Sequence, residues 1–471
     1  MATGFLKVKG DRIVDQNDDP VQLRGTSLGG SLCMENFING YPGTESFARA
    51  ALLDVMGREN YDYFFDRFHH HFFTEKDAQL LQSLGFNAAR IPFSYKHFED
   101  DANPRVLKED GFRHLDRMVD LCAAHGIYVI LDMHTVPGCQ NPDWHSDNHT
   151  SYAAFWDFKD HQDRTVWLWE QIAARYRDNP WIAGYNPLNE PCDPQQVRVA
   201  AFYDRLEAAL RAVDPHHMLF LDGNTFAMEW KGFTHTLPNA VYSIHDYSTM
   251  GFPAGQRYKG TPEQDDKLER QYRRKCEFHY RHGVPVWVGE FGPTFESSGR
   301  RPDAAQINAE RFALLGRQLR IYEGQRVSWS LWTYKDLGHM GTVCVAPDSP
   351  YVRLLRPFLD RKARLQTDSA STGPSEELDP LIDGLAAWID EVSPTARKTY
   401  PPNWDTRQHV RRNTVQTFLA SSLCGEFAEL FRGLDKPQLE ELARSWALEN
   451  CLQKEGLNAV IAQNTKPAAS S

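Results

Sequence analysis

From residue 21 to about residue 365 the chain alternates short apolar runs with longer amphipathic ones. The short runs are rich in β-branched and aromatic residues, which is typical of buried strands, and begin at residues 21, 86, 126, 181, 217, 240, 285 and 327. Between most of them apolar residues recur every three or four positions, as on one face of a helix. The segment after the fifth run is short and poorly helical. Eight strands with intervening helices predict an α/β fold, the (β/α)8 TIM barrel, over residues 1–366.

A doubly wound open sheet is the alternative, and it is disfavoured because no Gly-rich phosphate loop follows any of the eight runs. Beyond the barrel, the polar stretch 367–404 has the composition of a linker. Residues 405–463 show a helical pattern and predict a C-terminal helical element. Its apolar positions include Phe418, Leu419, Phe431 and Trp446, so it must pack on the barrel or on a second subunit, the barrel being the simpler expectation. Residues 464–471 are expected to be disordered.

Composition narrows the class of protein. With 41% hydrophobic residues the chain can build a large core, and its net charge of −11 without a long basic run argues against nucleic acid and against anionic membranes as partners. The first residues form no apolar signal or membrane span, which predicts a soluble, cytoplasmic protein. Eight cysteines without C-x-x-C spacing favour free thiols, although Cys139 and Cys192 follow neighbouring predicted strands and could approach each other.

Two glutamates stand at the ends of predicted strands. Glu190 follows the run that starts at residue 181, and Glu290 closes the run that starts at residue 285. A buried carboxylate without a partner is too costly to keep, and in this barrel the catalytic groups lie at the carboxyl ends of the strands. Two carboxylates facing each other suit glycosidic bond cleavage, where one gives a proton to the leaving oxygen and the other attacks or stabilises the anomeric carbon.

The sequences around these glutamates, "NEP" at 189–191 and "GEFG" at 289–292, resemble the two active-site motifs of glycoside hydrolase family 5. The order of motifs extends the resemblance over roughly residues 5–360. It implies that Glu190 is the acid/base, that Glu290 is the nucleophile, and that Asn189 donates a hydrogen bond to the sugar 2-hydroxyl. It also implies a retaining hydrolase that needs no cofactor and no metal.

Further matches to the family name the remaining candidates. Arg90 would hold the nucleophile ionised through a charge-assisted hydrogen bond, and His134 and His245 match substrate-contacting histidines. Tyr247 can donate its phenol proton to the nucleophile, and Trp332 would form the apolar floor beneath the sugar ring. The structural alternatives are a surface ion pair for Arg90, satisfied core histidines, and aromatic residues that only pack.

Two other features carry less weight. The histidines at 69–71 lack a second ligand cluster at metal spacing, so a solvated face is expected there rather than a zinc site. In the loop at 28–43 the chain has Ser31 where the family is expected to carry tryptophan. Because of this departure, the resemblance does not predict the geometry of the outer pocket wall.

The family covers several sugars, so the resemblance fixes the mechanism better than the substrate. Large loops at 29–72 and 135–155 could close one end of a cleft, which favours an exo-acting enzyme on short β-linked oligosaccharides or small β-glycosides. Glucose, mannose and xylose all remain open, as does a homo-oligomeric state. An endo-acting β-glucanase or mannanase and a non-catalytic carbohydrate-binding barrel are the alternatives.

Overall fold

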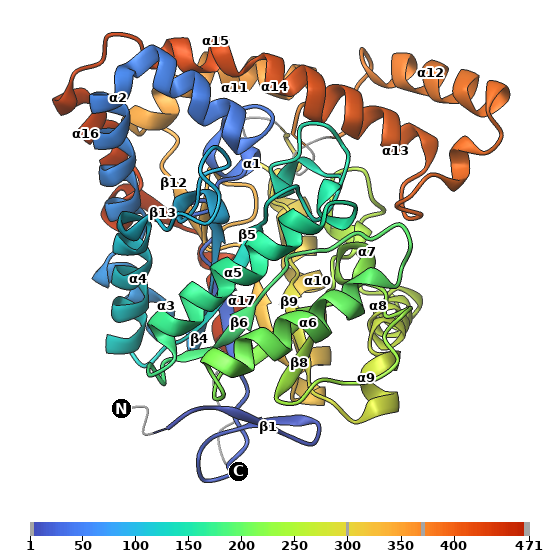
Figure 1. Ribbon diagram of the computed structural model, residues 1–471. Helices are drawn as coiled ribbons and strands as arrows, with labels where there is room; N and C mark the ends of the chain where they lie inside the picture. Colours follow the sequence, from blue (N-terminus) through green and yellow to red (C-terminus); the bar gives the residue numbers. More distant parts are fainter. Residues whose placement is uncertain (1–3, 298–300, 369–372, 466–471) are drawn as a thin grey trace.

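The computed structural model describes residues 4–297, 301–368 and 373–465. Its centre is one closed parallel barrel in the order β10-β3-β4-β5-β6-β7-β8-β9 (Figure 1). All eight predicted strands are confirmed, as β3 (Arg24–Ser27), β4 (Ala88–Ser94), β5 (Tyr128–Thr135), β6 (Ile182–Asn186), β7 (Met218–Asp222), β8 (Ala240–His245), β9 (Val286–Glu290) and β10 (Ser328–Leu331).

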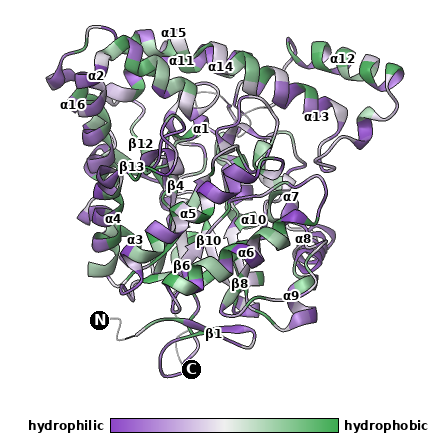
Figure 2. Ribbon diagram, in the orientation of Figure 1, coloured by the Kyte–Doolittle hydropathy of each residue, from purple (hydrophilic) through white to green (hydrophobic). Residues whose placement is uncertain are grey.

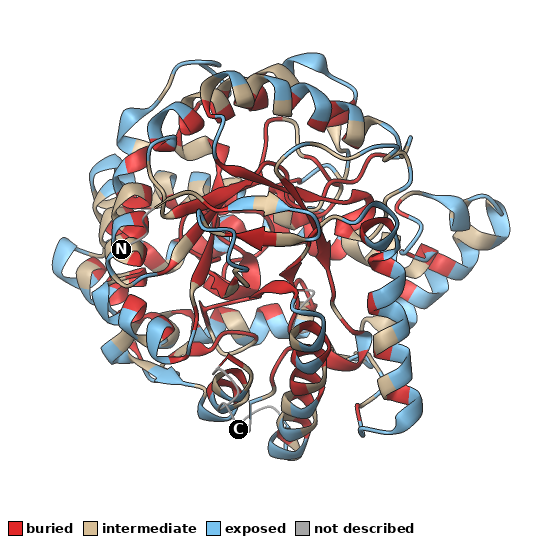
Figure 3. Cartoon of the chain, turned by 90° about the horizontal axis from the view of Figure 1, so that it is seen from below, coloured by how far each residue is buried: buried red, intermediate tan, exposed pale blue. Residues whose placement is uncertain are grey.

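Helices surround this barrel and turn their apolar faces inward. In α4, for example, Leu115, Met118, Val119 and Cys122 are buried at helical spacing. Figure 2 shows hydrophobic and hydrophilic residues alternating along these helices, and Figure 3 shows the buried strands inside a ring with exposed outer faces. The helices are α1 (Asn36–Asn39), α2 (Glu45–Phe72), α3 (Glu75–Ser83), α4 (Phe112–Ala124), α5 (Lys159–Tyr176), α6 (Arg198–Val213), α7 (Asn224–Ala227), α8 (Pro262–Lys275), α9 (Glu277–His282), α10 (Ala304–Gln325) and α11 (Pro350–Leu365). Single turns are η1 (Tyr95–His97), η2 (Glu109–Gly111), η3 (Trp144–Ser146), η4 (Ala154–Trp156) and η5 (Thr249–Gly251).

A hairpin that the sequence pattern did not predict closes the amino-terminal end of the barrel. Its strands β1 (Lys7–Lys9) and β2 (Arg12–Val14) are antiparallel and lie below the barrel in Figure 1. Leu6 and Ile13 pack with the side chains that fill the barrel interior, among them Phe220 and Trp287. The open end is therefore the opposite one, where the strands have their carboxyl ends.

Two register shifts shape that open end. The pairing of β4 with β5 shifts between Phe93 and Ser94, and the pairing of β8 with β9 shifts between Ile244 and His245. The second shift places His245 opposite Glu290 in the register. Bulges of this kind aim side chains near active sites.

The segment after the barrel departs from expectation. The linker expected over residues 367–404 instead contains helix α12 (Asp379–Val392) and the turn η6 (Ala396–Lys398), while 369–372 lie outside the described residues. The helical element continues with α13 (Thr406–Val410), the π-helix η7 (Arg411–Leu419), α14 (Ala420–Ser422), α15 (Cys424–Ala428), η8 (Glu429–Phe431), α16 (Lys436–Arg444), η9 (Leu448–Asn450) and α17 (Glu455–Thr465). It also adds a strand, β13 (Cys451–Gln453), to the small sheet of β11 (Lys335–Asp336) and β12 (Val343–Val345).

This C-terminal region packs on α2 and α11 of the same chain. Ring contacts join Phe64 to Phe431, Phe68 to Trp446 and Phe358 to Phe427, with centroids 5.2–5.7 Å apart. In Figure 1 the helices from α12 to α15 extend across the end of the molecule opposite the β1–β2 hairpin. The expected burial of Phe418 and Leu419 is wrong, because their exposed fractions are 72% and 39%.

Three further sequence-based expectations concern the tail, the histidines at 69–71 and two cysteines. Helix α17 includes residues 464 and 465 of the expected disordered tail, and residues 466–471 lie outside the described part. Of the histidines expected on a solvated face, His69 is buried and His71 pairs with Glu440 at 2.8 Å. Cys139 and Cys192 are both free. In the described part of the chain, no helix combines the length and apolarity needed to cross a membrane.

Candidate active site

Glu290, at the end of β9, is held by two donors, one on β4 and one just after β8. Arg90 on β4 donates from Nη1 to Oε1 of Glu290, and the Tyr247 hydroxyl donates to Oε2 at 2.9 Å. The Arg90 side chain is fully buried, and that of Glu290 is 6% exposed. A guanidinium and a phenol thus bind both carboxylate oxygens and fix their positions.

Arg90 also organises the neighbouring strand ends. Its Nη2 donates to the side-chain oxygens of Asn186 at 3.0 Å and Asn189 at 2.7 Å, and lies 3.0 Å from Asp132. Burial disfavours its charge, but the surrounding carboxylates, Asp132 first, raise the pKa of Arg90 above its usual value. Because Arg90 takes the Asn189 oxygen, the amide nitrogen of Asn189 is left as the donor that faces away from it.

Glu190 lies beyond β6 and meets two histidines. Its Oε1 is 2.6 Å from Nδ1 of His245, and its Oε2 is 3.1 Å from Nε2 of His145. Its backbone adopts φ +50°, a conformation that side chains rarely adopt, and its N–H donates to Asp222 at 2.9 Å. The strained backbone and the aspartate together aim the carboxylate into the barrel mouth.

The two histidines decide the charge of Glu190. Burial alone would raise the pKa of this carboxyl, but the positive charge of His245 and the hydrogen bond from His145 hold it well below its usual range. In turn, burial would lower the pKa of His145, and hydrogen bonds with Asp143 and Glu190 raise it well above the usual value. Both pKa directions favour an imidazolium beside an ionised carboxylate.

The two candidate carboxylates are close together. One oxygen of Glu190, one of Glu290 and a ring nitrogen of His245 all lie within 4.8 Å of one another. Retaining glycosidases place the two groups about 5–5.5 Å apart and inverting ones about 6.5–9.5 Å, so this spacing suits retention. Although the three side chains are near enough to share a cation, Arg90 and the histidine charges oppose one, and the absence of a metal and a cofactor stays a prediction.

The two remaining predicted residues, His134 and Trp332, contact each other beside Asn189. His134 lies 3.2 Å from the Asn189 amide nitrogen, and Trp332 stacks on the His134 ring with centroids 5.2 Å apart. Burial would lower the pKa of His134, but Asp132 at 2.8 Å and Glu35 at 3.5 Å raise it to about 9. Arg90, His134, Asn189, Glu190, His245, Tyr247, Glu290 and Trp332 are therefore all brought to one place.

Comparisons with known proteins identify the family. A family model described as cellulase (glycosyl hydrolase family 5) matches residues 58–338. A β-xylosidase of Phanerodontia chrysosporium is 50% identical over 476 residues, which make up 99% of this chain and 99% of that protein. The chain belongs to glycosyl hydrolase family 5. As a family 5 member it is a retaining glycoside hydrolase, and the non-catalytic alternative is set aside.

More distant relatives agree with this family 5 fold. A probable glucan 1,3-beta-glucosidase A of Emericella nidulans is 30% identical, over 57% of this chain and 67% of its own. The crystal structure of an endogalactoceramidase superposes with a TM-score of 0.52 at 19% identity, covering 71% of this chain and 75% of that one. At that identity the solved structure supports the barrel fold alone.

Sequence reasoning missed several residues of the candidate site. His145 lies in the loop after β5, where only the polarity of the segment gave a signal, and Asp222 ends β7 beside a glycine. Asp132 lies two residues before His134 on β5, and side chains two residues apart in a strand point to the same face. Its inward direction could therefore have been predicted from the strand periodicity. Glu35, in the loop after β3, is 4% exposed and lies 3.5 Å from His134.

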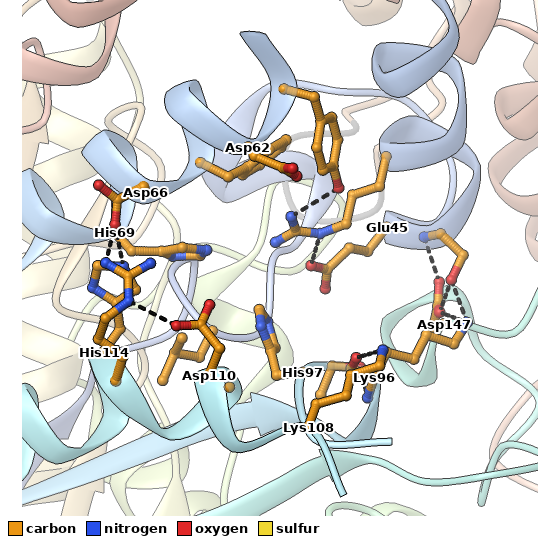
Figure 4. A pocket seen from close by; sticks show the side chains of 18 residues that line it. Glu45, Asp62, Asp66, His69, Lys96, His97, Lys108, Asp110, His114 and Asp147 are labelled. Carbon is orange, nitrogen blue, oxygen red and sulfur yellow. Dashed lines mark hydrogen bonds and ion pairs between the residues drawn. The ribbon is translucent and has the colours of Figure 1, made fainter. Parts of the chain in front are cut away.

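A polar cavity of about 340 Å³ lies beside the His145 loop, lined by α2, η1 and α4 (Figure 4). Neither candidate carboxylate, Glu190 or Glu290, lines it. On its side nearest the loop, Asp147 pairs with Lys96 at 2.7 Å and accepts from the Ser46 backbone at 2.8 Å. The cavity wall thus anchors one end of the loop that carries His145. Ser31, the departure from the expected tryptophan, points toward the same region, 3.3 Å from His69.

Proposed function

We propose that this family 5 enzyme is an exo-acting β-xylosidase that removes terminal xylose from short β-linked oligosaccharides or small β-xylosides. The observation that carries the proposal is the 50% identity to a β-xylosidase over 99% of both chains. Likeness that extends through the loops and the C-terminal region, and not only the barrel, favours a shared substrate and disfavours an endo-acting enzyme. Glucose and mannose are the competing sugars.

In the proposed reaction Glu290 is the nucleophile. Its carboxylate attacks the anomeric carbon while the glycosidic oxygen leaves with a proton, which forms a glycosyl-enzyme ester that water later hydrolyses. Arg90 and Tyr247 hold the carboxylate oxygens in place before attack. The Asn189 amide nitrogen, oriented by Arg90, would donate to the sugar 2-hydroxyl. Trp332 would support the apolar face of the sugar, with His134 and Glu35 binding its hydroxyls.

Glu190 is the proposed acid/base, and its proton source lies next to it. A general acid must be protonated when the leaving group departs, yet the two histidines keep Glu190 ionised in the free enzyme. We infer that His145 or His245 passes its proton to Glu190 as the substrate displaces water from the site. Glu190 then gives that proton to the leaving oxygen, and in the second step it takes a proton from the attacking water.

The test is a panel of nitrophenyl β-xyloside, β-glucoside and β-mannoside with the wild type. We expect kcat/KM for the xyloside to exceed the other two by at least about tenfold, since one extra group in a closed pocket changes binding by about 1–3 kcal/mol. Glu290→Gln, which lacks the proposed nucleophile, serves as the control that the turnover belongs to this site. A preference for the glucoside that this variant abolishes would reject xylose while leaving the family chemistry intact.

A further inference from the structure

The contacts of His145 continue outward to the C-terminal element. Its Nδ1 lies 3.5 Å from Oδ2 of Asp143, and the same Asp143 oxygen forms an ion pair with Arg412 on η7. Asp143 is 4% exposed, and its other oxygen accepts from the Trp144 backbone at 2.9 Å. A charged chain therefore runs from Glu190 through His145 and Asp143 to a residue 269 positions away from Asp143 in sequence.

The segment around Arg412 is itself fixed on loops next to Glu190. The Arg412 guanidinium lies 4.5 Å from the centre of the Trp404 ring, and Trp404 stacks on Phe226 with centroids 5.5 Å apart. Tyr400 makes a 3.0 Å hydrogen bond with Thr225. Thr225 and Phe226 both have positive φ, 55° and 59°, so this loop holds a strained shape with the C-terminal segment packed on it.

We propose that Arg412 is a positioning residue of the active site, which holds Asp143 and thereby keeps the His145 imidazole on the acid/base Glu190. The inference rests on the proposed function of Glu190. It gives residues 400–412 a role in the reaction that lies outside the barrel.

The physical reason is that Asp143 cannot stay buried and charged on its own. Burial would raise the pKa of Asp143, but the Arg412 charge and His145 hold it below its usual range. Removing one partner of a buried ion pair leaves an uncompensated charge, so the loop must rearrange or take up a proton. Either change weakens the 3.5 Å contact between Asp143 and Nδ1 of His145, and leaves the Asn141 amide, 3.0 Å from Nε2, as the remaining polar contact of the ring besides Glu190.

The expected effect on Glu190 depends on all the charges around it. The titratable groups that face Glu190 are His145 from the β5 loop, Cys192 from its own loop, Asp222 from β7, His245 and Tyr247 from β8 and its end, and Glu290 from β9. Loss of the Arg412 charge makes this surrounding more negative, so the pKa of Glu190 should rise. The proton of the free enzyme is shared between Glu190 and its histidines, so the alkaline limb of kcat/KM reports this coupled group and should move up by several tenths of a pH unit.

The experiment compares Arg412→Gln, Arg412→Lys and Arg407→Gln in the full chain. Arg407 is the matched control, because it lies on α13, one turn before Arg412 in the same C-terminal region, but pairs with Asp379 and Asp383 of α12 instead of Asp143. Two substrates are used, nitrophenyl β-xyloside with a good leaving group and xylobiose with a poor one. We expect Arg412→Gln to lose about tenfold in kcat/KM on xylobiose and much less on the nitrophenyl substrate, because only the poor leaving group needs the acid. Arg412→Lys should recover most of the loss, and Arg407→Gln should match the wild type.

Equal losses on both substrates, or an Arg412→Gln enzyme with wild-type rates and pH profile, would overturn the proposal. A crystal structure of Arg412→Gln tests the same proposal without any substrate, because His145 should move away from its 3.1 Å contact with Glu190. A His145 that stays in place would also overturn it. A wild type inactive on every glycoside would instead reject the proposed function, and the crystal structure would still decide the role of Arg412.

Discussion

Glu190 and Glu290 lie close together but have different nearest partners, although Nδ1 of His245 lies 2.6 Å from Glu190 and 3.5 Å from Glu290. Glu290 accepts from a guanidinium and a phenol, neither of which readily gives up its proton, whereas Glu190 contacts two imidazoles that can. A nucleophile must stay ionised and an acid/base must exchange protons, so the partners fit the two proposed roles. The roles can be separated by removing one carboxylate at a time.

Glu290→Gly should abolish hydrolysis and leave a space where the nucleophile stood. Azide or formate can occupy that space and attack from the same face, so activity should return with added azide and the product should be an α-glycosyl azide. The measurement is turnover of nitrophenyl β-xyloside with and without azide, with NMR of the product.

Glu190→Ala is the counterpart to that variant. It should spare formation of the glycosyl-enzyme from nitrophenyl substrates and slow its hydrolysis, because the water then lacks its base. A burst of nitrophenol followed by slow turnover is the expected trace. If azide produced an inverted product in Glu190→Ala and a retained one in Glu290→Gly, the two assignments would have to be exchanged.

At the scale of elements, the barrel depends on close approach between strands. Gly184 on β6 is paired with Met218 on β7, and a Cβ on Gly184 would lie 2.1 Å from the Met218 backbone oxygen. Backbone atoms of a barrel strand cannot move aside as a flexible side chain can. The lack of a side chain at Gly184 thus allows β6, the strand that leads to Glu190, to lie close to β7.

We therefore expect Gly184→Ala to destabilise the fold by at least about 1–3 kcal/mol, as overpacking of a core does. Gly324→Ala is the matched control, since Gly324 lies in α10 and an added methyl group there would have no neighbour within 4 Å, and it should gain about 0.4–1 kcal/mol. Urea unfolding of both variants measures the difference. Similar stability of the two would show that β6 and β7 can separate at no cost.

The elements that could be predicted are those with long, regular patterns. Each barrel strand carries an apolar run bounded by polar residues, so all eight were found. The β1–β2 hairpin was missed because its strands have three residues each, too short to show an alternation. Helix α12 was missed because its apolar residues Leu381, Leu385 and Trp388 follow a stretch rich in Ser and Pro, whose linker-like composition obscures their helical spacing.

At the scale of the whole molecule, residues far apart in sequence come into contact, and no local sequence pattern indicates these contacts. The eight predicted site residues lie on or just after barrel strands, and they could be predicted because barrel topology brings all strand ends together. His145 and Arg412 could not, because loop conformation and the docking of the C-terminal element decide their places. Lys335 is a similar case: fully buried, it donates to Asp77 on α3 at 2.7 Å and to the Trp446 carbonyl at 2.8 Å.

The C-terminal element should therefore be part of the fold and not an independent module. Trp446 is fully buried against Phe68 and Phe72 of α2, so Trp446→Ala should cost about 3–5 kcal/mol in the free energy of unfolding. Phe418→Ala is the control in the same element, and because Phe418 is 72% exposed it should change stability by less than about 0.5 kcal/mol.

Truncation after residue 366 removes Trp446, the Lys335 partner and Arg412 together, and should give an insoluble protein. A soluble truncated protein with an unchanged melting temperature, together with a neutral Trp446→Ala, would show that the barrel folds without this element.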